Sequence, residues 1–487
     1  MLHHTGPPFS RLPIEIVRRI FLYACHSTRG TLPNDPNDES SQRQLVRRTL
    51  QFVCKDWEQI VIDDAELWNV LDLRIAPPGH DADVHTPVSL AVVDATLRLA
   101  RSWLCHAARA SISLDLSVAP CVEEEAACVR ILSFLSAYRF KALSIVTRIP
   151  SILDLNEYAG SLFDVEALSL TASTPFPRPI RLISHRLPFS SLESLLLDVN
   201  IGNTYEELLS VFPWDRLHRL LLSVTRNIET AADILRRCTS LLDCTISIKQ
   251  GPTTFITLED INFPCLKHLT IDNKVITPVT QAIVQSIVAP GLESLVLHCS
   301  YSTPAPISDA VETMARKSGF QDGLQELVIR NFRGVMTRPE KVLLKFTPSL
   351  RVLKVSGRAV INKDILPLLG NGSLVPQLEK ISFSGCGIRP DALLEMTENR
   401  QKNANKEDSR NVDILTSFTH VSLRCRHSRV TDDHFRRMFR LRKEYRFYMT
   451  LSGGSSDSLD SDGIDDDSDE ADVVSEDESS GSGDELE

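Results

Sequence analysis

Residues 192–197 read Leu-Glu-Ser-Leu-Leu-Leu, a six-residue word of the form L-x-x-L-x-L that recurs down most of the chain. The word begins at Phe140, Val165, Leu192, Leu217, Leu241, Leu266, Leu292, Leu324, Leu350 and Leu378. Successive words are 24 to 32 residues apart. A repeat of this period predicts stacked supersecondary units, each of which buries its apolar side against its neighbours.

Each word is expected to be a short strand whose alternate side chains point into the core. Helical patterns lie between the words, at Glu206–Phe212, Thr230–Arg237, Thr280–Ala289, Asp309–Lys317, Glu340–Phe346 and Asp391–Asn399. Strand plus helix at this period resembles the leucine-rich-repeat family. The predicted fold class is therefore α/β, with a horseshoe-shaped solenoid of about 10–12 repeats over residues 110–425. Only Asn200 and Cys386 complete the longer repeat consensus, so we expect degenerate repeats.

A helical unit is predicted before the array, over residues 9–72. Apolar residues at positions 13, 16, 17, 20 and 21 trace one helical face, and a second helical run extends from Leu45 to Val61. The segment between them, residues 27–42, is polar, contains two prolines and predicts a loop. Asp63-Asp64 is a plausible helix cap, and Leu67-Trp68 follows.

These residues carry a second resemblance. Leu12-Pro13-Ile14-Glu15-Ile16, then Val53-Cys54-Lys55-Asp56-Trp57, then Leu67-Trp68, resemble the F-box, a three-helix motif. The layout is most similar to the F-box-like proteins that are abundant in mushroom-forming fungi, in which a leucine-rich-repeat array follows the motif. The loop at 27–42 is longer than that of the compact family motif.

The resemblance implies that the helical unit binds the Skp-type adaptor of a cullin–RING ubiquitin ligase. The residues that would form or support that interface are Leu12, Pro13, Ile16, Val53, Cys54 and Trp57. The alternative is a helical cap that only covers the first repeat, because the end of a solenoid leaves its core exposed. Trp57 and Trp68 suit a core position in either case.

Three further segments complete the predicted organisation. Residues 73–109 form a linker with a helix at 89–109, and Ile112, Leu114 and Leu116 begin the array as a strand. Phe418, Val421 and Leu423 predict its last strand, and residues 426–452 a basic C-terminal helix that begins near Thr431. Residues 453–487 have too little apolar content to offset chain entropy, so we expect a disordered acidic tail.

The net charge of −11 resides in that tail. Residues 453–487 contain fifteen Asp and Glu and no Lys or Arg, which leaves 53 basic and 49 acidic side chains, a net of +4, in the other 452 residues. Nucleic-acid binding by the body is therefore not expected. Residues 424–446 hold nine Arg and Lys against three acids, and could contact the tail, an acidic partner or nucleic acid.

The tail itself has two interpretations: a solvating extension, or a regulated segment. Ser475 and Ser482 each precede an acid by three residues, as acidophilic kinase sites do. Phosphorylation would add about −1.5 to −2 charge at each serine.

The register of the words predicts which side chains line the open face of the array. In a word that begins at position n, side chains n+2, n+4 and n+6 should point away from the core. Leu196 and Leu221, and Val296 and Val328, are then apolar where solvent is expected. The full predicted client-binding set is Leu196, Leu221, His268, Asp272, Val296, His298, Glu326, Val328, Arg330 and Lys354. The alternative is that a loop or a terminal segment covers these residues.

Motifs of catalysis are absent from the sequence: it contains no phosphate-binding G-x-x-x-x-G-K-[ST], no G-x-S-x-G and no H-E-x-x-H. We therefore expect no enzyme activity and no cofactor. Cys425 and His427 are an isolated pair, which favours a strand end over a metal site. No apolar run is long enough to span a membrane, and no secretory signal is visible. Eleven cysteines without C-x-x-C spacing predict reduced thiols inside a cell, in the cytoplasm, the nucleus or both.

Taken with the absence of catalytic motifs, the F-box resemblance implies a non-catalytic substrate receptor of a ubiquitin ligase. Its N-terminal helices would bind the adaptor, and its array would bind an unknown protein client. The alternative is a leucine-rich-repeat interaction scaffold with no link to ubiquitin.

Overall fold

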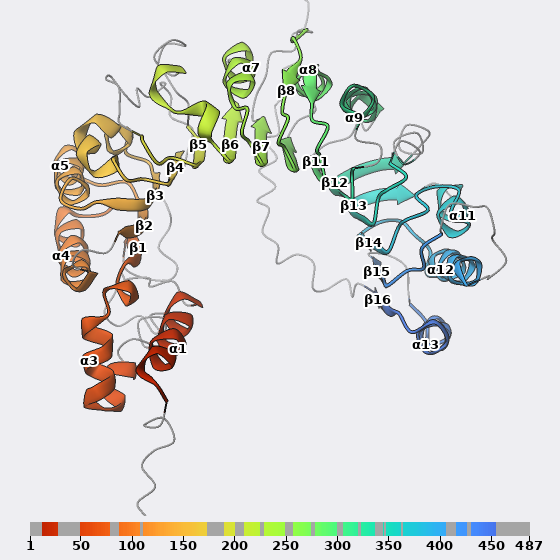
Figure 1. Ribbon diagram of the computed structural model, residues 1–487, viewed down its shortest axis with the longest axis horizontal. Helices are drawn as coiled ribbons and strands as arrows, with labels where there is room; N and C mark the ends of the chain where they lie inside the picture. Colours follow the sequence, from red (N-terminus) through yellow and green to blue (C-terminus); the bar gives the residue numbers. More distant parts are fainter. Residues whose placement is uncertain are drawn as a thin grey trace, which may run out of the picture.

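The structure is a computed structural model of the 487-residue chain. It describes residues 12–27, 49–77, 87–107, 111–172, 189–199, 209–224, 228–248, 257–273, 278–299, 305–319, 323–336, 344, 347–361, 364–405, 415–425 and 430–453. These residues form a mixed α/β fold around one parallel sheet of 14 strands. Figure 1 shows the sheet as an arc, with the strands along its inner side and most of the helices outside. The predicted α/β class is confirmed.

The strands lie side by side in chain order, and every neighbouring pair is parallel. They are β1 (Val70–Ile75), β2 (Ile112–Val118), β3 (Phe140–Thr147), β4 (Ala167–Ala172), β5 (Ser194–Asp198), β6 (Arg219–Val224), β7 (Asp243–Ile248), β9 (His268–Asn273), β11 (Ser294–Cys299), β12 (Glu326–Met336), β13 (Val352–Ile361), β14 (Lys380–Ser384), β15 (His420–Cys425) and β16 (Tyr448–Gly453). Two short strands, β8 (Ile261–Asn262) and β10 (Ile287–Val288), form a separate parallel pair.

Each leucine-spaced word overlaps one of these strands, as predicted, and the register aligns the words. Leu195 of β5 lies opposite Leu168 of β4 and Leu220 of β6, so equivalent apolar positions form a column across the sheet. The same column continues through Cys244, Leu269, Leu295, Leu327, Leu353, Ile381, Val421 and Met449, all of them buried. Burial of one such leucine contributes about 1.5–3 kcal/mol, which explains why the register follows the words.

The helices that connect the strands are α4 (Leu90–Ala107), α5 (Glu124–Leu135), α7 (Ile228–Arg237), α8 (Pro278–Ser286), α9 (Ala305–Ser318), α11 (Ile365–Gly370), α12 (Pro390–Ala404) and α13 (Asp432–Tyr445). Short 3-10 helices occur at η3 (Ala65–Leu67), η4 (Pro150–Leu153), η5 (Leu155–Leu162) and η6 (Trp214–Arg216). The helices expected near Thr230, Asp309 and Asp391 are present as α7, α9 and α12. In the segment Glu206–Phe212, the described residues 209–211 are helical, and of Glu340–Phe346 only Leu344 is described.

The helices α1 (Ile14–Ser27) and α3 (Lys55–Asp63) precede the sheet, together with the helical residues 49–53 and η3. The sequence pattern predicted one helical run up to Val61, but the structure interrupts it at Cys54. Residues 49–53 are helical, and Cys54 is extended (φ −164°, ψ 166°) and begins α3 as its N-cap. Asp64 caps the next turn, because its side chain accepts the N–H of Glu66. Most of the loop predicted at residues 27–42 lies outside the described residues.

Both ends of the sheet extend beyond the predicted array. Leu71, Leu73 and Ile75 alternate into the core as β1, at positions that the sequence analysis assigned to the helical unit and a linker. At the other end, the predicted helix over 426–452 is correct only as far as Tyr445. Phe447, Met449 and Leu451 then alternate into the core around β16. Of the predicted acidic tail, 454–487 lie outside the described residues.

A buried arginine fixes the C-terminal part of the fold. Arg400 of α12 has no exposed surface, and its guanidinium donates to the carbonyl oxygens of Thr416, Leu369, Val375, Pro376 and Leu378 at 2.6–3.1 Å. The same group lies 4.8 Å from the centroid of the Phe418 ring. Burial lowers the pKa of Arg400 to about 10, so the side chain is still charged at neutral pH.

Candidate interaction surfaces

Apolar side chains are exposed on α1 and on the helical turn before α3. Of the predicted adaptor-binding residues, Leu12 is 37%, Ile16 41% and Val53 54% exposed. Pro13 and Cys54 are also exposed, whereas Trp57 is half-buried. Four further exposed apolar side chains were not predicted: Ile14, Ile20, Tyr23 and Phe52. Together with Leu12, Ile16 and Val53, they make up what we call the N-terminal apolar surface. The sequence pattern predicted that α1 is a helix, but it did not show which side of that helix is exposed.

The opposite side of α1 is packed. Val17 and Phe21 are buried, and the ring of Phe21 meets the indole of Trp57 edge-on with 4.8 Å between centroids. This contact packs α3, which carries Trp57, against α1, which carries Phe21. The packing leaves Ile16 and Ile20 facing away from the contact that Val17 and Phe21 make.

Three contacts fix these helices to the sheet. The Arg18 guanidinium on α1 donates to the Asp64 carboxylate at 2.7 Å, and this hydrogen bond raises the pKa of Arg18. The indole N–H of Trp68 donates to the Val61 carbonyl at 2.6 Å. The indole N–H of Trp103, on α4, donates to the Trp68 carbonyl at 3.0 Å. The helices thus pack on the β1 end of the sheet as part of its core.

The second surface is the inner face of the sheet, which we define as the strand positions that alternate with the core column. Leu196 lies opposite Leu221 on the next strand, and Val296 lies opposite Val328. Leu196, Leu221 and Val296 are half-buried, while Val328 retains only 6% of its surface. The register thus brings together each predicted apolar pair.

Glu326 is the centre of a polar group on this face. Its carboxylate accepts from Lys354 Nζ at 2.8 Å and from Ser294 Oγ at 3.2 Å. The bond from Lys354 is the main reason that the pKa of Glu326 is lowered, and His268 contributes through its charge. The predicted residues Glu326, Lys354 and His268 therefore belong to one electrostatic group.

The remaining predicted polar residues form a neighbouring group. Asp272 Oδ1 lies 3.8 Å from His298 Nδ1, and its other oxygen accepts from Ser247 Oγ at 3.4 Å. Burial lowers the pKa of His298, Asp272 opposes this shift, and Arg330 adds to it. The net shift favours the neutral imidazole of His298.

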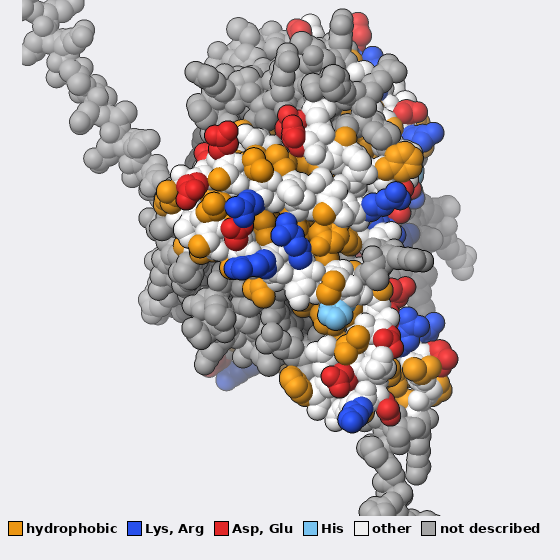
Figure 2. Space-filling model, turned by 90° about the vertical axis from the view of Figure 1, so that its left-hand side faces the viewer, with side chains coloured by type: hydrophobic (Ala, Val, Ile, Leu, Met, Phe, Trp, Pro, Cys, Tyr) orange, Lys and Arg blue, Asp and Glu red, His pale blue; other side chains and the backbone are white. Residues whose placement is uncertain are grey.

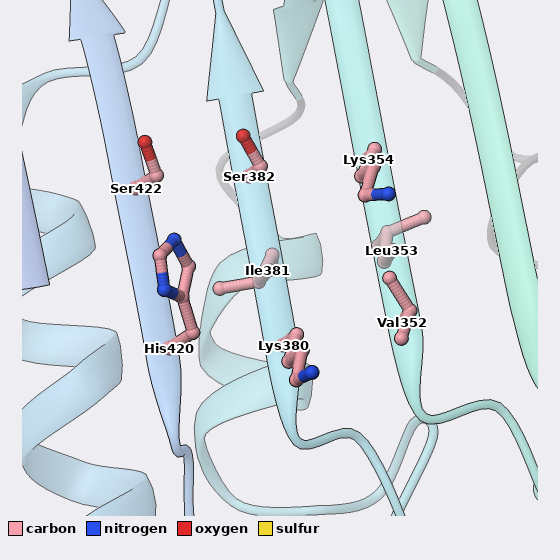
Figure 3. Close-up of a pocket in the computed structure, with 8 residues that line it drawn as sticks. All are labelled: Val352, Leu353, Lys354, Lys380, Ile381, Ser382, His420 and Ser422. Carbon is pink, nitrogen blue, oxygen red and sulfur yellow. The ribbon is translucent and has the colours of Figure 1, made fainter. Parts of the chain in front are cut away.

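Sequence reasoning missed a shallow hollow further along the inner face. It has a volume of about 350 Å³ and is lined by Val352, Leu353, Lys354, Lys380, Ile381, Ser382, His420 and Ser422. Figure 3 shows the Lys354, Lys380 and His420 side chains on the same side of β13, β14 and β15, with helices behind the sheet. Burial and the adjacent Lys380 lower the pKa of His420, whose ring stacks on Tyr448 at 4.8 Å.

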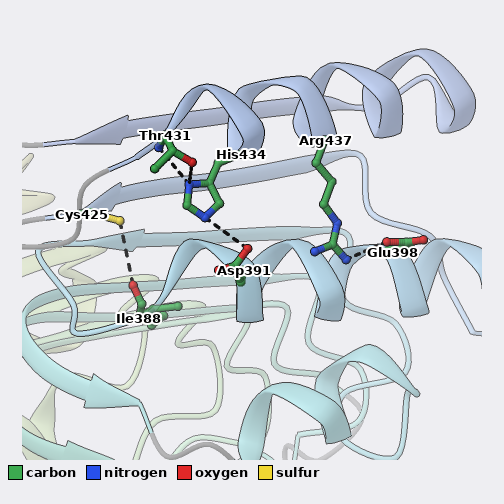
Figure 4. Close-up of polar contacts among 7 residues, drawn as sticks. All are labelled: Ile388, Asp391, Glu398, Cys425, Thr431, His434 and Arg437. Carbon is green, nitrogen blue, oxygen red and sulfur yellow. Dashed lines mark hydrogen bonds and ion pairs between the residues drawn. The ribbon is translucent and has the colours of Figure 1, made fainter.

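One hydroxyl, one imidazole and one carboxylate are aligned between α12 and α13 (Figure 4). Thr431 Oγ1 lies 2.8 Å from His434 Nδ1, and His434 Nε2 lies 3.2 Å from Asp391 Oδ1. The backbone N–H of Thr431 also donates to Nδ1 at 2.9 Å. The threonine oxygen accepts the backbone N–H of His434 in turn, so the group is a capping box that begins α13. Helix capping therefore explains the alignment of these three side chains, and no catalytic nucleophile has to be assigned to it.

The pair Cys425 and His427 is only partly described. Cys425 is buried and its Sγ lies 4.0 Å from the Ile388 carbonyl oxygen (Figure 4), and burial raises the pKa of its thiol. His427 and the candidate phosphorylation sites Ser475 and Ser482 lie outside the described residues. Within the described ranges there is no group of three or more His, Cys, Asp or Glu side chains arranged to hold a metal ion.

The outer face over α3, α4 and α5 differs from the N-terminal apolar surface. Figure 2 shows apolar, basic and acidic side chains interspersed there. Exposed Leu99 and Val129 are examples of its apolar members. None of the helices in the described part of the chain is both long and apolar enough to cross a membrane.

Comparison with known proteins gives no relative: no family model and no curated protein matches this sequence.

Proposed function

We propose that the protein is a non-catalytic substrate receptor of a cullin–RING ubiquitin ligase. In this proposal α1, residues 49–53 and α3 act as an F-box-like unit that binds a Skp-type adaptor. The sheet and its outer helices act as a leucine-rich-repeat solenoid that presents a protein client on its inner face. The ubiquitin-transfer chemistry belongs to other subunits.

The N-terminal apolar surface carries the proposal. Fifteen large apolar side chains are exposed in the described part of the chain, and seven of them fall within residues 12–53. Phe52 and Tyr23 are 86% and 81% exposed, far more than a helical cap needs for its own packing. Exposed large apolar side chains concentrated in one part of a fold are typical of a protein–protein interface.

The inner face supports the client role. The half-buried pair Leu196 and Leu221 lies on β5 and β6, and Val296 of β11 lies among the polar groups around Asp272 and Glu326. A surface that combines apolar and polar side chains in this way suits protein recognition.

A second function, a leucine-rich-repeat scaffold with no ubiquitin link, is favoured by one observation. The contacts Arg18–Asp64 and Trp103–Trp68 integrate the N-terminal helices with the end of the sheet, as a solenoid cap requires. The two functions share the same inner face and differ in whether the N-terminal apolar surface has a partner.

Adaptor binding separates them. The full chain is mixed with a purified Skp-type adaptor, and the complex is measured by size-exclusion chromatography and calorimetry. The double variant Ile16→Asp with Phe52→Asp should weaken binding at least tenfold. The matched control Leu99→Asp places the same charge at an apolar position of the outer face, 51% exposed, and should leave binding unchanged.

The receptor function requires that the unaltered chain bind the adaptor at micromolar concentration. If it does not, the scaffold function stands. Equal binding by the double variant would move the interface away from α1 and residue 52.

A further inference from the structure

The inner face is electrostatically polarised along the sheet. From β1 to β7, its charged side chains are four acids and two cations: Asp72, Asp115, Asp198, Asp243, Arg74 and Arg219. Among the side chains that the structure describes from β12 to β16, they are one acid and four cations: Glu326, Arg330, Lys354, Lys380 and Arg424. The net charge is −2 over β1–β7 and +3 over β12–β16, which we call the acidic half and the basic half. Between them, β9 and β11 carry Asp272, His268 and His298 on the same face.

Glu326 neutralises only part of the second half. It pairs with Lys354 at 2.8 Å. In the described part of the chain, no carboxylate lies within ion-pair distance of Lys380 or Arg424, and both side chains are exposed. Hydroxyls line the space between these cations, at Ser382, Ser384 and Ser422. Cations interspersed with hydroxyl donors are suited to carboxylates.

We propose that the acidic C-terminal segment, residues 454–487, docks on this basic half of the inner face, across β13, β14 and β15. The segment carries fifteen carboxylates and no Lys or Arg, so its charge is complementary to the unpaired cations around the hollow. Docking there covers part of the proposed client surface, which makes the segment an internal competitor of an acidic client. The contact does not depend on adaptor binding.

The point of attachment allows this contact. The segment leaves the sheet from Gly453, the last residue of β16, which lies next to β15. To reach the hollow, the segment has to cross the sheet from β16 to β13, at about 4.8 Å per strand, and return along the strand direction, at about 3.3 Å per residue. The straight-line distance is roughly 20 Å. For 34 residues the random-coil relation gives a root-mean-square end-to-end distance of roughly 30 Å, so the number of residues is sufficient to bridge this distance. Tethering therefore keeps the carboxylates at high effective concentration beside the hollow.

The basic helix α13 is a weaker site for the same segment. Its first turn carries Asp432 and Asp433. Of its cations, Arg437 is already bonded to Glu398 at 2.8 Å, and Arg442 lies over the rings of Phe439 and Tyr448.

A carbodiimide, which joins an amine to a carboxylate in direct contact, tests the proposal on the full chain. Mass spectrometry of the cross-linked, digested protein should find Lys380 joined to Asp or Glu of residues 457–487. The yield should fall several-fold when the salt concentration is raised from 50 to 500 mM, because the contact is electrostatic. Mixing isotopically light and heavy chains shows whether the joined residues belong to one chain.

A pair of charge reversals supplies the control. Arg424→Glu should reduce the Lys380 cross-links several-fold, whereas Arg219→Glu, an exposed inner-face cation in the acidic half, should leave them unchanged. Cross-links to Lys443 of α13 in place of Lys380 would overturn the proposal, as would mainly light–heavy products. Unaltered yield in Arg424→Glu would overturn it equally.

Discussion

The indole N–H of Trp103 donates to the main-chain carbonyl oxygen of Trp68 at 3.0 Å, and the two rings meet edge-on with 4.9 Å between centroids. Trp68 in turn donates to the carbonyl of Val61 at the end of α3. This pair therefore joins the N-terminal helices to α4 and the first strand. It fixes the orientation in which the N-terminal apolar surface is presented relative to the sheet.

Trp103→Phe should lower the free energy of unfolding by about 1–3 kcal/mol, because it leaves the buried Trp68 carbonyl without its donor. Urea unfolding followed by circular dichroism measures the change. Leu99→Ala is the control on the same helix: Leu99 is half-exposed, so its replacement should cost under about 1 kcal/mol. A cost for Trp103→Phe no larger than that of Leu99→Ala would mean that the hydrogen bond does not stabilise the junction.

Arg400 supplies a second stability prediction. Arg400→Met removes the donors to five carbonyl oxygens and should lower the free energy of unfolding by about 3–5 kcal/mol. Arg400→Lys keeps the charge, but its single ammonium cannot reproduce the planar fork, so a loss of about 2 kcal/mol or more is expected. Thermal unfolding checks both, with exposed Asn399→Ala on the same helix as control. If Arg400→Lys is neutral, the charge and not the fork stabilises this part of the fold.

Core positions account for what could be predicted from the sequence. The words beginning at Leu192 and Leu217 specify strands because a one-residue slip would turn every leucine toward solvent. The alternation of Leu71 with Leu73 and of Met449 with Leu451 carries the same information at the ends of the sheet. At the first end, the helical motif before β1 obscured this alternation. At the second end, the basic helix that precedes β16 obscured it.

Residues of the inner face could be predicted only where the alternation of side chains along a strand determines which way each one points. Leu196 and Leu221 could be placed opposite each other because strand side chains alternate and the words set the register. The hollow beside Lys380 and His420 could not, because it depends on how strands over 60 residues apart are aligned. The exposure of Phe52 was likewise hidden, since the backbone becomes extended at Cys54 and interrupts the helical run.

Glu398 makes the packing of α13 on α12 sensitive to acid. Its carboxylate accepts from Lys402 at 2.7 Å and from Arg437 at 2.8 Å, and these bonds lower its pKa to about 2. A carboxylate whose pKa is lower in the folded state stabilises the fold above its unfolded pKa of about 4.3. That stabilisation is lost as the pH falls from about 4.3 to about 2.

Glu398→Gln should therefore lower the free energy of unfolding by about 1–2 kcal/mol at pH 7, because the two bonds to cations are weakened. The difference between variant and unaltered chain should shrink as the pH falls through this window, since protonated Glu398 resembles glutamine. Urea unfolding at pH 7, 4 and 2.5 measures it, with Glu395→Gln, an exposed position on α12, as control. A difference independent of pH would show that the ionised carboxylate is not the stabilising species.

Client capture should depend on the adjacent pair Leu196 and Leu221. Replacing both by alanine removes half-buried apolar surface from the inner face without altering the core column that holds the strands. The expected result is unchanged adaptor binding and a several-fold lower recovery of the proteins that co-purify with the unaltered chain, measured by quantitative mass spectrometry. Thr245→Ala with Thr270→Ala, two positions further along the same row, is the matched control. Because a threonine presents less apolar surface than a leucine, the threonine pair should change recovery less. Equal recovery by the leucine variant, with thermal stability retained, would place client recognition elsewhere on the inner face.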